Sequence, residues 1–105
     1  MNLPIRDGQD ETIEVHLSMV GGLRRLVGVG RERLTVPSVT RIRDVVSVLS
    51  DRHPELGELL DGGDAIEDGR VVLLLNGRNL LLFDDPDRLL QQGDKLVLTH
   101  PLGGG

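Results

Sequence analysis

The sequence contains no cysteine, tryptophan or tyrosine, and its only aromatic residue is Phe83. Without a thiol, the chain has no disulfide framework, thiolate metal site, iron–sulfur cluster or cysteine nucleophile. One aromatic ring makes no platform for stacking bases, and a net charge of -5 is opposite to that of a protein built to bind a phosphate backbone. These absences favour chemistry without side-chain sulfur and a partner other than nucleic acid.

Long hydrophobic runs and catalytic groupings are also missing. The longest apolar run, residues 71–75, has the length of a strand and is far short of the roughly 20 residues that span a membrane. Residues 1–10 lack the apolar segment of a signal peptide. The three histidines stand apart, and the carboxylates of residues 61–68 do not follow calcium-loop spacing. We therefore expect a cytoplasmic, monomeric single domain without a metal site, membrane contact or catalytic triad.

Alternating polarity predicts two paired strands near the N-terminus. Apolar and polar residues alternate over residues 12–19, and residues 33–37 resume this alternation. A glycine-bounded connection over residues 20–30 separates the two stretches and contains about one turn of helix. We expect the two stretches to pair as an antiparallel hairpin.

One helical stripe follows the predicted hairpin. Apolar residues recur at the spacing i, i+3, i+4 and i+7, and these are Ile42, Val45, Val46 and Leu49. Ser38 or Thr40 is expected to cap the start of this helix, and Pro54 to end it. Beyond it, residues 55–60 are predicted to form a short turn and residues 61–69 a loop.

Three more strands complete the predicted sheet. Residues 70–75 form a continuous apolar run, which is typical of a central strand covered on both faces. Asn76-Gly77 is a hairpin-turn signal, and residues 80–83 are expected to form the short strand after it. The final strand covers residues 95–100 and ends at Pro101.

The order of these elements predicts an α+β fold of the β-grasp, or ubiquitin-like, type. A hairpin, a helix and a returning strand require a right-handed crossover. One main helix on one face of a mixed sheet of about four to five strands buries both apolar surfaces. We expect a disordered N-terminal extension over residues 1–11, the folded domain over residues 12–100, and a flexible glycine tail over residues 101–105.

Several clusters outside this framework have a structural interpretation. His16 and His53 are expected to be ordinary surface residues. Gly21-Gly22 and the pair Gly28 and Gly30 lack the third glycine and the strand-to-helix context of a nucleotide site, so a flexible connection is the better interpretation. A basic cluster, interpreted as a solvated surface with RNA or an acidic partner as the functional alternative, consists of Arg24, Arg25, Arg31 and Arg33.

The last five residues, 101–105, suggest a reactive terminus. Because Pro101 stops the final strand, we expect this segment to project, and five extended residues reach up to about 17 Å. Three consecutive glycines can enter a channel too narrow for side chains. The α-carboxylate of Gly105 has an ordinary pKa of about 3.5 and is a poor acyl donor until it is activated, for example by adenylation with ATP. The alternative is a frayed chain end without function.

The ending GDKLVLTHPLGGG, residues 93–105, resembles that of the ubiquitin-like sulfur carriers and small modifiers. That superfamily includes the molybdopterin synthase small subunit, the thiamine-pathway sulfur carrier, the archaeal small modifier proteins and the ubiquitin-related modifier. Residues 21–28 resemble a segment of the last of these, residues 33–49 resemble the strand-to-helix passage common to the group, and residues 71–80 resemble the strand that ends in an Asn-Gly or Asn-Asp turn. Together these pieces favour the ubiquitin-related modifier. However, the ubiquitin-related modifier usually ends in Leu-His-Gly-Gly, whereas Pro-Leu-Gly-Gly-Gly is nearer to the archaeal and molybdopterin-type tails.

This resemblance implies that the chain is a carrier rather than an enzyme, with no cofactor of its own. Gly105 would be adenylated with ATP by a partner that resembles the ubiquitin-activating enzyme. A persulfide on that enzyme or on a rhodanese would then leave a thiocarboxylate on Gly105. The residues implied to enter or contact the partner are Leu102, Gly103 and Gly104, with Pro101 and His100 before them.

The resemblance leaves several destinations open. The sulfur would pass to tRNA as 2-thiouridine, to molybdopterin or to thiazole, or the tail would be joined to lysines of target proteins, from which a protease releases it. Lys95 is the only lysine and the candidate acceptor for self-conjugation. Because Lys95 lies in a predicted strand, we expect self-linked chains to be scarce. The alternatives are a molybdopterin synthase small subunit and a non-covalent β-grasp interaction module.

Overall fold

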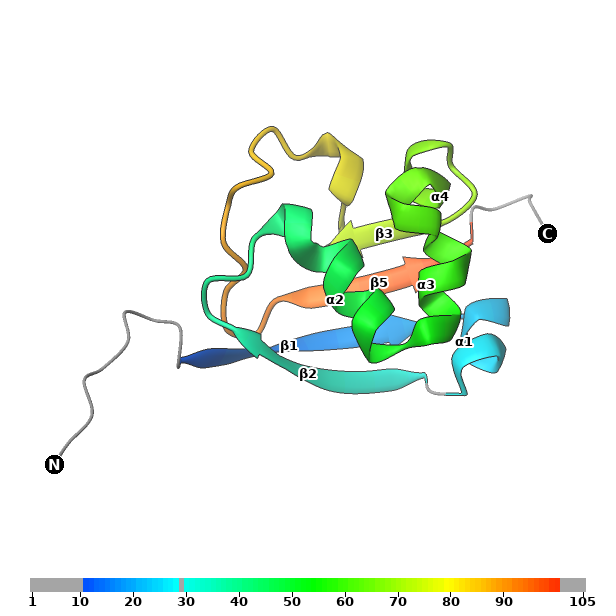
Figure 1. Ribbon diagram of the computed structural model, residues 1–105, viewed down its shortest axis with the longest axis horizontal. Helices are drawn as coiled ribbons and strands as arrows, with labels where there is room; N and C mark the ends of the chain where they lie inside the picture. The colour runs from blue at the N-terminus through cyan, green and yellow to red at the C-terminus, as the bar shows by residue number, and fades with distance from the viewer. Residues whose placement is uncertain (1–10, 29, 101–105) are drawn as a thin grey trace, which may run out of the picture.

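The computed structural model describes residues 11–28 and 30–100 and contains one mixed five-stranded sheet with helices across one face (Figure 1). The strands are β1 Thr12–Met19, β2 Arg31–Pro37, β3 Val72–Leu75, β4 Arg78–Asn79 and β5 Lys95–Thr99. The helices are α1 Gly22–Val27, α2 Val45–Arg52, α3 Pro54–Leu60 and α4 Asp64–Glu67. The sheet order β2-β1-β5-β3-β4 confirms the predicted α+β β-grasp fold.

The pairing of β1 organises the sheet. β1 pairs antiparallel with β2, as predicted, and parallel with β5, which is the central strand. β3 lies inside the sheet between β5 and β4, but the expectation that both of its faces are covered is wrong. Leu73 and Leu75 are buried under the helices, whereas Val72 and Leu74 are only half-buried on the opposite face.

The core lies between the sheet and the helices. Along β1, Val15, Leu17 and Met19 are buried, in the alternation that the sequence predicted. On the helical side, the predicted stripe is confirmed, since Ile42, Val45 and Leu49 are buried and Val46 is packed against them. Apolar burial of this kind is the main force that stabilises so small a domain.

The start of the helical segment differs from the prediction. The first helical turn is a 3-10 turn over Ile42–Asp44 with Arg41 as its cap, and not a helix capped at Ser38 or Thr40. The backbone N–H of Arg41 donates to Oδ2 of Asp44 at 2.9 Å. Thr40 is buried and donates its hydroxyl to the carbonyl of Pro37 at 2.7 Å, so its oxygen belongs to the preceding turn.

The segment after Pro54 contains more helix than the sequence predicted. Pro54 ends α2, but as the first residue of α3 it also starts a new helix, where its missing N–H costs nothing. The single main helix is therefore two consecutive helices, and the expected loop over residues 61–69 contains a 3-10 turn and α4. Burial of Leu56, Leu60 and Ile66 explains this gain in helix.

The hairpin after β3 is confirmed at its turn and wrong in its second strand. Asn76 and Gly77 have φ values of 52° and 85°, the left-handed pair that a two-residue hairpin turn requires. β4 occupies Arg78–Asn79, and within the strand predicted over residues 80–83 Leu80–Leu82 form a 3-10 turn. The side chain of Asn79 accepts a hydrogen bond from the backbone N–H of Leu81 at 2.9 Å, which turns the chain out of the sheet.

Two predictions concern residues outside the described part of the chain. The predicted disordered extension lies there over residues 1–10, as does the glycine tail, residues 101–105. Glu11 is described, and its carbonyl accepts a hydrogen bond from the N–H of Ser38 at 2.9 Å. In the described ranges, every helix is too short or too polar to cross a membrane.

Candidate functional site

The end of β5 is where the chain runs into the predicted reactive segment. Because β1 and β5 are parallel, they end at the same edge of the domain, and α1 follows β1 there (Figure 1). The N–H of Val20, just after β1, donates to the carbonyl of Leu98 at 3.2 Å. The N–H of Met19 donates to Gly30 at 2.8 Å and closes the connection that contains α1. The central strand therefore leads toward residue 101 beside a short, tied-down helix.

His100 is the one predicted tail-contact residue that the structure describes. It is exposed, and a Cβ added to Gly22 at the start of α1 would lie 3.7 Å from its Nε2 atom. The hydroxyl of Thr99 donates to the carbonyl of His100 at 3.2 Å. The last described residue thus lies close to Gly22 at the start of α1, in the connection that the sequence suggested was only flexible.

The remaining predicted tail residues lie outside the described residues. These are Pro101, Leu102, Gly103, Gly104 and Gly105. Their roles remain predictions from the sequence. What the structure adds is the position of the residue that precedes them, at the end of the central strand and beside α1.

Lys95 lies at the opposite end of β5 from His100 and is exposed. Asn76 holds the backbone of Lys95 through two hydrogen bonds. The Lys95 N–H donates to Oδ1 of Asn76 at 2.9 Å, and the Lys95 carbonyl accepts from the Asn76 N–H at 2.8 Å. Lys95 is therefore in a strand, as predicted. The scarcity of self-linked chains stays a prediction.

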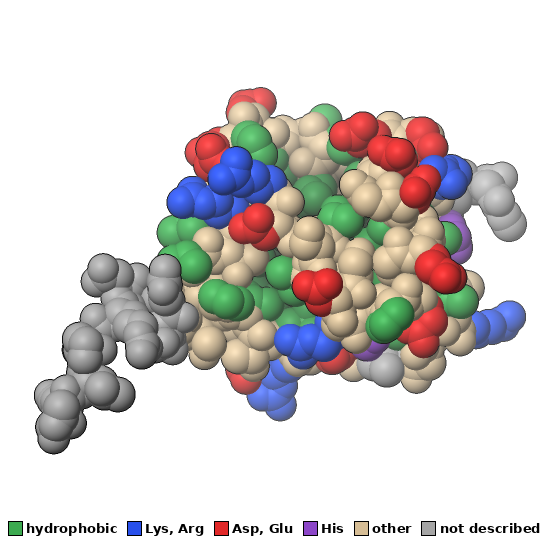
Figure 2. All heavy atoms as spheres, in the orientation of Figure 1, with side chains coloured by type: hydrophobic (Ala, Val, Ile, Leu, Met, Phe, Trp, Pro, Cys, Tyr) green, Lys and Arg blue, Asp and Glu red, His purple; other side chains and the backbone are tan. Residues whose placement is uncertain are grey.

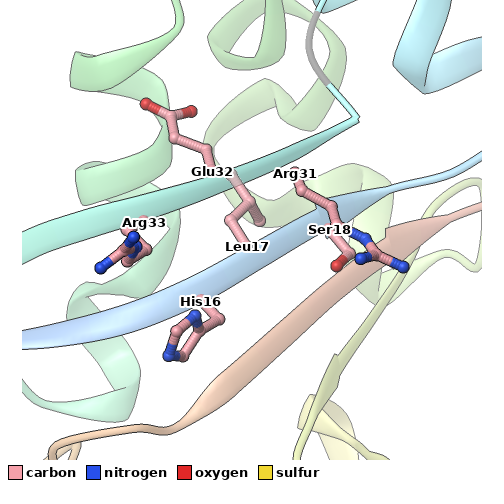
Figure 3. Close-up of a pocket in the computed structure, with 6 residues that line it drawn as sticks. All are labelled: His16, Leu17, Ser18, Arg31, Glu32 and Arg33. Atoms are coloured by element: carbon pink, nitrogen blue, oxygen red, sulfur yellow. The ribbon is translucent and has the colours of Figure 1, made fainter.

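Basic side chains lie together on the sheet face away from the helices. The sequence predicted only part of this group. Arg31 and Arg33 of β2 lie with His16 and Ser18 of β1 around a hollow of about 280 Å³ (Figure 3). Lys95 is the register partner of His16 across the β1–β5 pair. The sequence did not indicate that Lys95 lies beside His16, because a parallel pairing of distant strands leaves no local signal.

His53 is more than the surface residue that we predicted. Its Nε2 atom lies 2.5 Å from Oε1 of Glu32, and the two side chains are 15% and 24% exposed. Glu32 therefore points away from Arg31 and Arg33, to the helix side of the hairpin (Figure 3). This contact ties β2 to the junction between α2 and α3.

Charge is distributed unevenly over the described surface. Figure 2, which shows the helix-covered side, has carboxylates gathered over the α4 region, where Asp61, Asp64, Glu67 and Asp68 are exposed. Within residues 11–28 and 30–100, no three His, Asp or Glu side chains are grouped so as to hold a metal ion. The described residues thus provide contact surfaces, and β5 leads toward residue 101.

Comparison with known proteins gives consistent matches. The profile of the ThiS family matches residues 17–105. Ubiquitin-related modifier 1 of Mycosarcoma maydis is 29% identical over 105 residues, covering 90% of this chain and 97% of that protein. The solution structure of small archaeal modifier protein 1 from Methanosarcina acetivorans has a TM-score of 0.67 and 25% identity, over 90% of this chain and 99% of that one.

One relative is much longer than this chain. Selenide, water dikinase of Pelobacter propionicus is 36% identical over 72 residues, which cover 64% of this chain. The match spans only 20% of the length of that protein.

Proposed function

The chain belongs to the ThiS family, and we propose that within this superfamily of ubiquitin-like sulfur carriers and modifiers its reacting group is the carboxyl group of Gly105. The observation that carries this proposal is the family match over residues 17–105, which includes the terminal glycines. The fold supports it, because the central strand leads toward residue 101 at the domain edge beside α1. The chain is then a cosubstrate, and a separate enzyme supplies the catalytic groups.

The proposed reaction begins with activation of the carboxylate. An oxygen of the Gly105 carboxylate attacks the α-phosphorus of ATP on an adenylating partner, pyrophosphate leaves, and an acyl-adenylate forms. The terminal sulfur of a persulfide, on that partner or on a rhodanese, then attacks the acyl carbon and AMP leaves. This step leaves an acyl disulfide, and a second thiol of the donor attacks its inner, donor-side sulfur, so that the thiocarboxylate is released and the donor is left with a disulfide.

Residues 102–104 have a steric role in this proposal. Glycines at 103 and 104 let the backbone enter a narrow channel of the partner in whatever conformation it imposes. Leu102, Pro101 and His100 would contact the mouth of that channel. His100 lies close to Gly22, at the edge of the domain where β5 ends.

Two further fates of Gly105 follow from the same activated species. Attack by a lysine amine instead of a persulfide joins the chain to a target protein, and a protease would reverse this step. We expect few self-linked products, since Lys95 offers the only lysine amine and its backbone is held in β5. The thiocarboxylate would serve an acceptor such as tRNA, thiazole or molybdopterin.

An ATP–pyrophosphate exchange assay tests the activation step. With an adenylating enzyme encoded in the same genome, the full chain should stimulate exchange, and a variant lacking Gly104 and Gly105 should not. A Lys95→Arg variant is the matched control, because it alters an exposed residue outside the tail and should stimulate exchange as the wild type does. Equal exchange with and without the terminal glycines would contradict the proposal.

A further inference from the structure

The open face of the sheet, opposite the helices, carries a cationic patch that has no part in the proposed tail chemistry. Strand registers place Arg33, His16 and Lys95 in one row across β2, β1 and β5. The next row is Arg31, Ser18 and Val97. Alternate residues of a strand point to opposite faces, so these side chains share the face that Leu17 and Leu34 leave free.

Arg24 of α1 extends this patch toward the end of β5. It lines a hollow of about 620 Å³ together with Arg31 and Ser18, over Val97. A Cβ added to Gly30 would lie 2.8 Å from Nε and 3.1 Å from Cζ of Arg24. The absence of a side chain at position 30 therefore leaves the space across which the Arg24 guanidinium lies.

The hollows of this face adjoin one another. A second hollow, of about 370 Å³, is lined by His16, Arg31 and Lys95 and also contains Ser18 and Val97. The hollow of Figure 3 shares His16, Ser18 and Arg31 with it. A ligand that follows β1 would thus meet positive charge from Arg24 at one end to Lys95 at the other.

These cations are not neutralised by the described residues. Arg24, Arg31 and Lys95 form no ion pair within residues 11–28 and 30–100, and Arg33 approaches Glu14 only to 4.0 Å, with side chains 71% and 44% exposed. Two arginines elsewhere on the described surface are paired: Arg43 lies 3.0 Å from Asp87, and Arg70 lies 2.8 Å from Asp68. In a chain of net charge -5, Arg24, Arg31, Arg33 and Lys95 thus form a local group of largely uncompensated positive charge.

We propose that the cationic patch, defined as Arg24, Arg31, Arg33, Lys95 and His16, docks an acidic segment of a partner protein. Guanidinium groups bind carboxylates in a planar, two-pronged geometry. Arg31 and Arg33 are two residues apart on one strand, a spacing of about 7 Å. An extended segment with carboxylates on alternate residues has the same spacing and fits both. This docking is separate from the chemistry of Gly105 and does not require it.

An acidic protein segment fits better than RNA. The described face has no phenylalanine, tyrosine or tryptophan on which a base could stack, because Phe83 lies elsewhere, under Arg78 and Arg88. The net charge of -5 disfavours a phosphate backbone. Half-buried Val72, Leu74 and Val97 continue the open face beside the patch, and an apolar area next to charged groups is typical of protein interfaces.

Titration of the full chain with a peptide of alternating Glu and Thr, followed by NMR at low ionic strength, tests the proposal. The amide signals of Ser18, Arg31 and Val97 should shift, and those of α2 should not. The double substitution Arg24→Gln/Arg31→Gln should weaken binding about threefold to tenfold. The matched control Arg43→Gln/Arg70→Gln removes the same charge from paired arginines and should bind the peptide as the wild type does.

A charge-neutral variant separates geometry from net charge. Gly30→Ala should displace Arg24 and weaken peptide binding while leaving the charge unchanged. Circular dichroism of each variant checks that the fold is kept. The proposal is overturned if the peptide fails to bind, if both double variants bind it equally, or if a single-stranded RNA of the same length binds more tightly than the peptide. Removal of Gly104 and Gly105 should leave peptide binding intact, so the two proposals fail independently.

Discussion

The two faces of the sheet are made of alternate residues of the same strands, yet they differ in burial and in the polarity of their side chains. In β1, Val15, Leu17 and Met19 are buried under the helices, whereas Glu14, His16 and Ser18 lie on the open face. On β2, Leu34 and Val36 face inward and Arg31 and Arg33 face outward. The comparison teaches that alternate residues of one strand have separate roles, since one set packs the core and the other set lies outside it.

The largest expected effect comes from truncating neighbouring leucines on opposite faces. Leu73→Ala removes a fully buried side chain under the helices and should lower the free energy of unfolding by about 2–5 kcal/mol. Leu74→Ala, the next residue of β3, is half-buried on the open face and should cost about 1 kcal/mol. Urea denaturation of both variants measures the difference. Equal losses would show that the open face carries as much of the core as the helix face.

A smaller effect is expected from neutralising one carboxylate on each side of the β1–β2 hairpin. Glu32→Gln weakens the partly buried contact with His53 and should cost about 1 kcal/mol at neutral pH. Glu14→Gln removes the same charge from an exposed position 4.0 Å from Arg33 and should cost close to nothing. Thermal unfolding at matched ionic strength compares the two. A larger loss of stability for Glu14→Gln than for Glu32→Gln would contradict the expected difference between the two faces.

Local patterns in the sequence predict much of this architecture. Alternating polarity predicts β1 and β2, and the helical stripe predicts the helix α2, in which Val45 and Leu49 are buried. Asn76-Gly77 predicts a turn, and the φ values of the two residues confirm it. Each of these signals is carried by residues close together in the chain, which is why they can be read without a structure.

Features that depend on distant contacts were missed or wrong. Nothing near Lys95 indicates that it pairs beside His16, because the parallel β1–β5 pairing joins remote segments. Pro54 ends α2 as predicted, but the helix that it also starts, in which Leu56 and Leu60 are buried, was missed. At the candidate site, the terminal glycines are predicted by motif alone, whereas the closeness of His100 to Gly22 of α1 depends on the fold.

The most direct test of the central claim is a mass measurement that locates the reacting atom. The full chain is incubated with an adenylating enzyme, MgATP and a persulfide donor, and its C-terminal fragments are compared before and after. We predict a mass gain equal to the replacement of one oxygen by sulfur, confined to fragments that contain Gly105 and dependent on ATP. An unchanged mass, or a gain that maps to any residue before 101, would contradict the account.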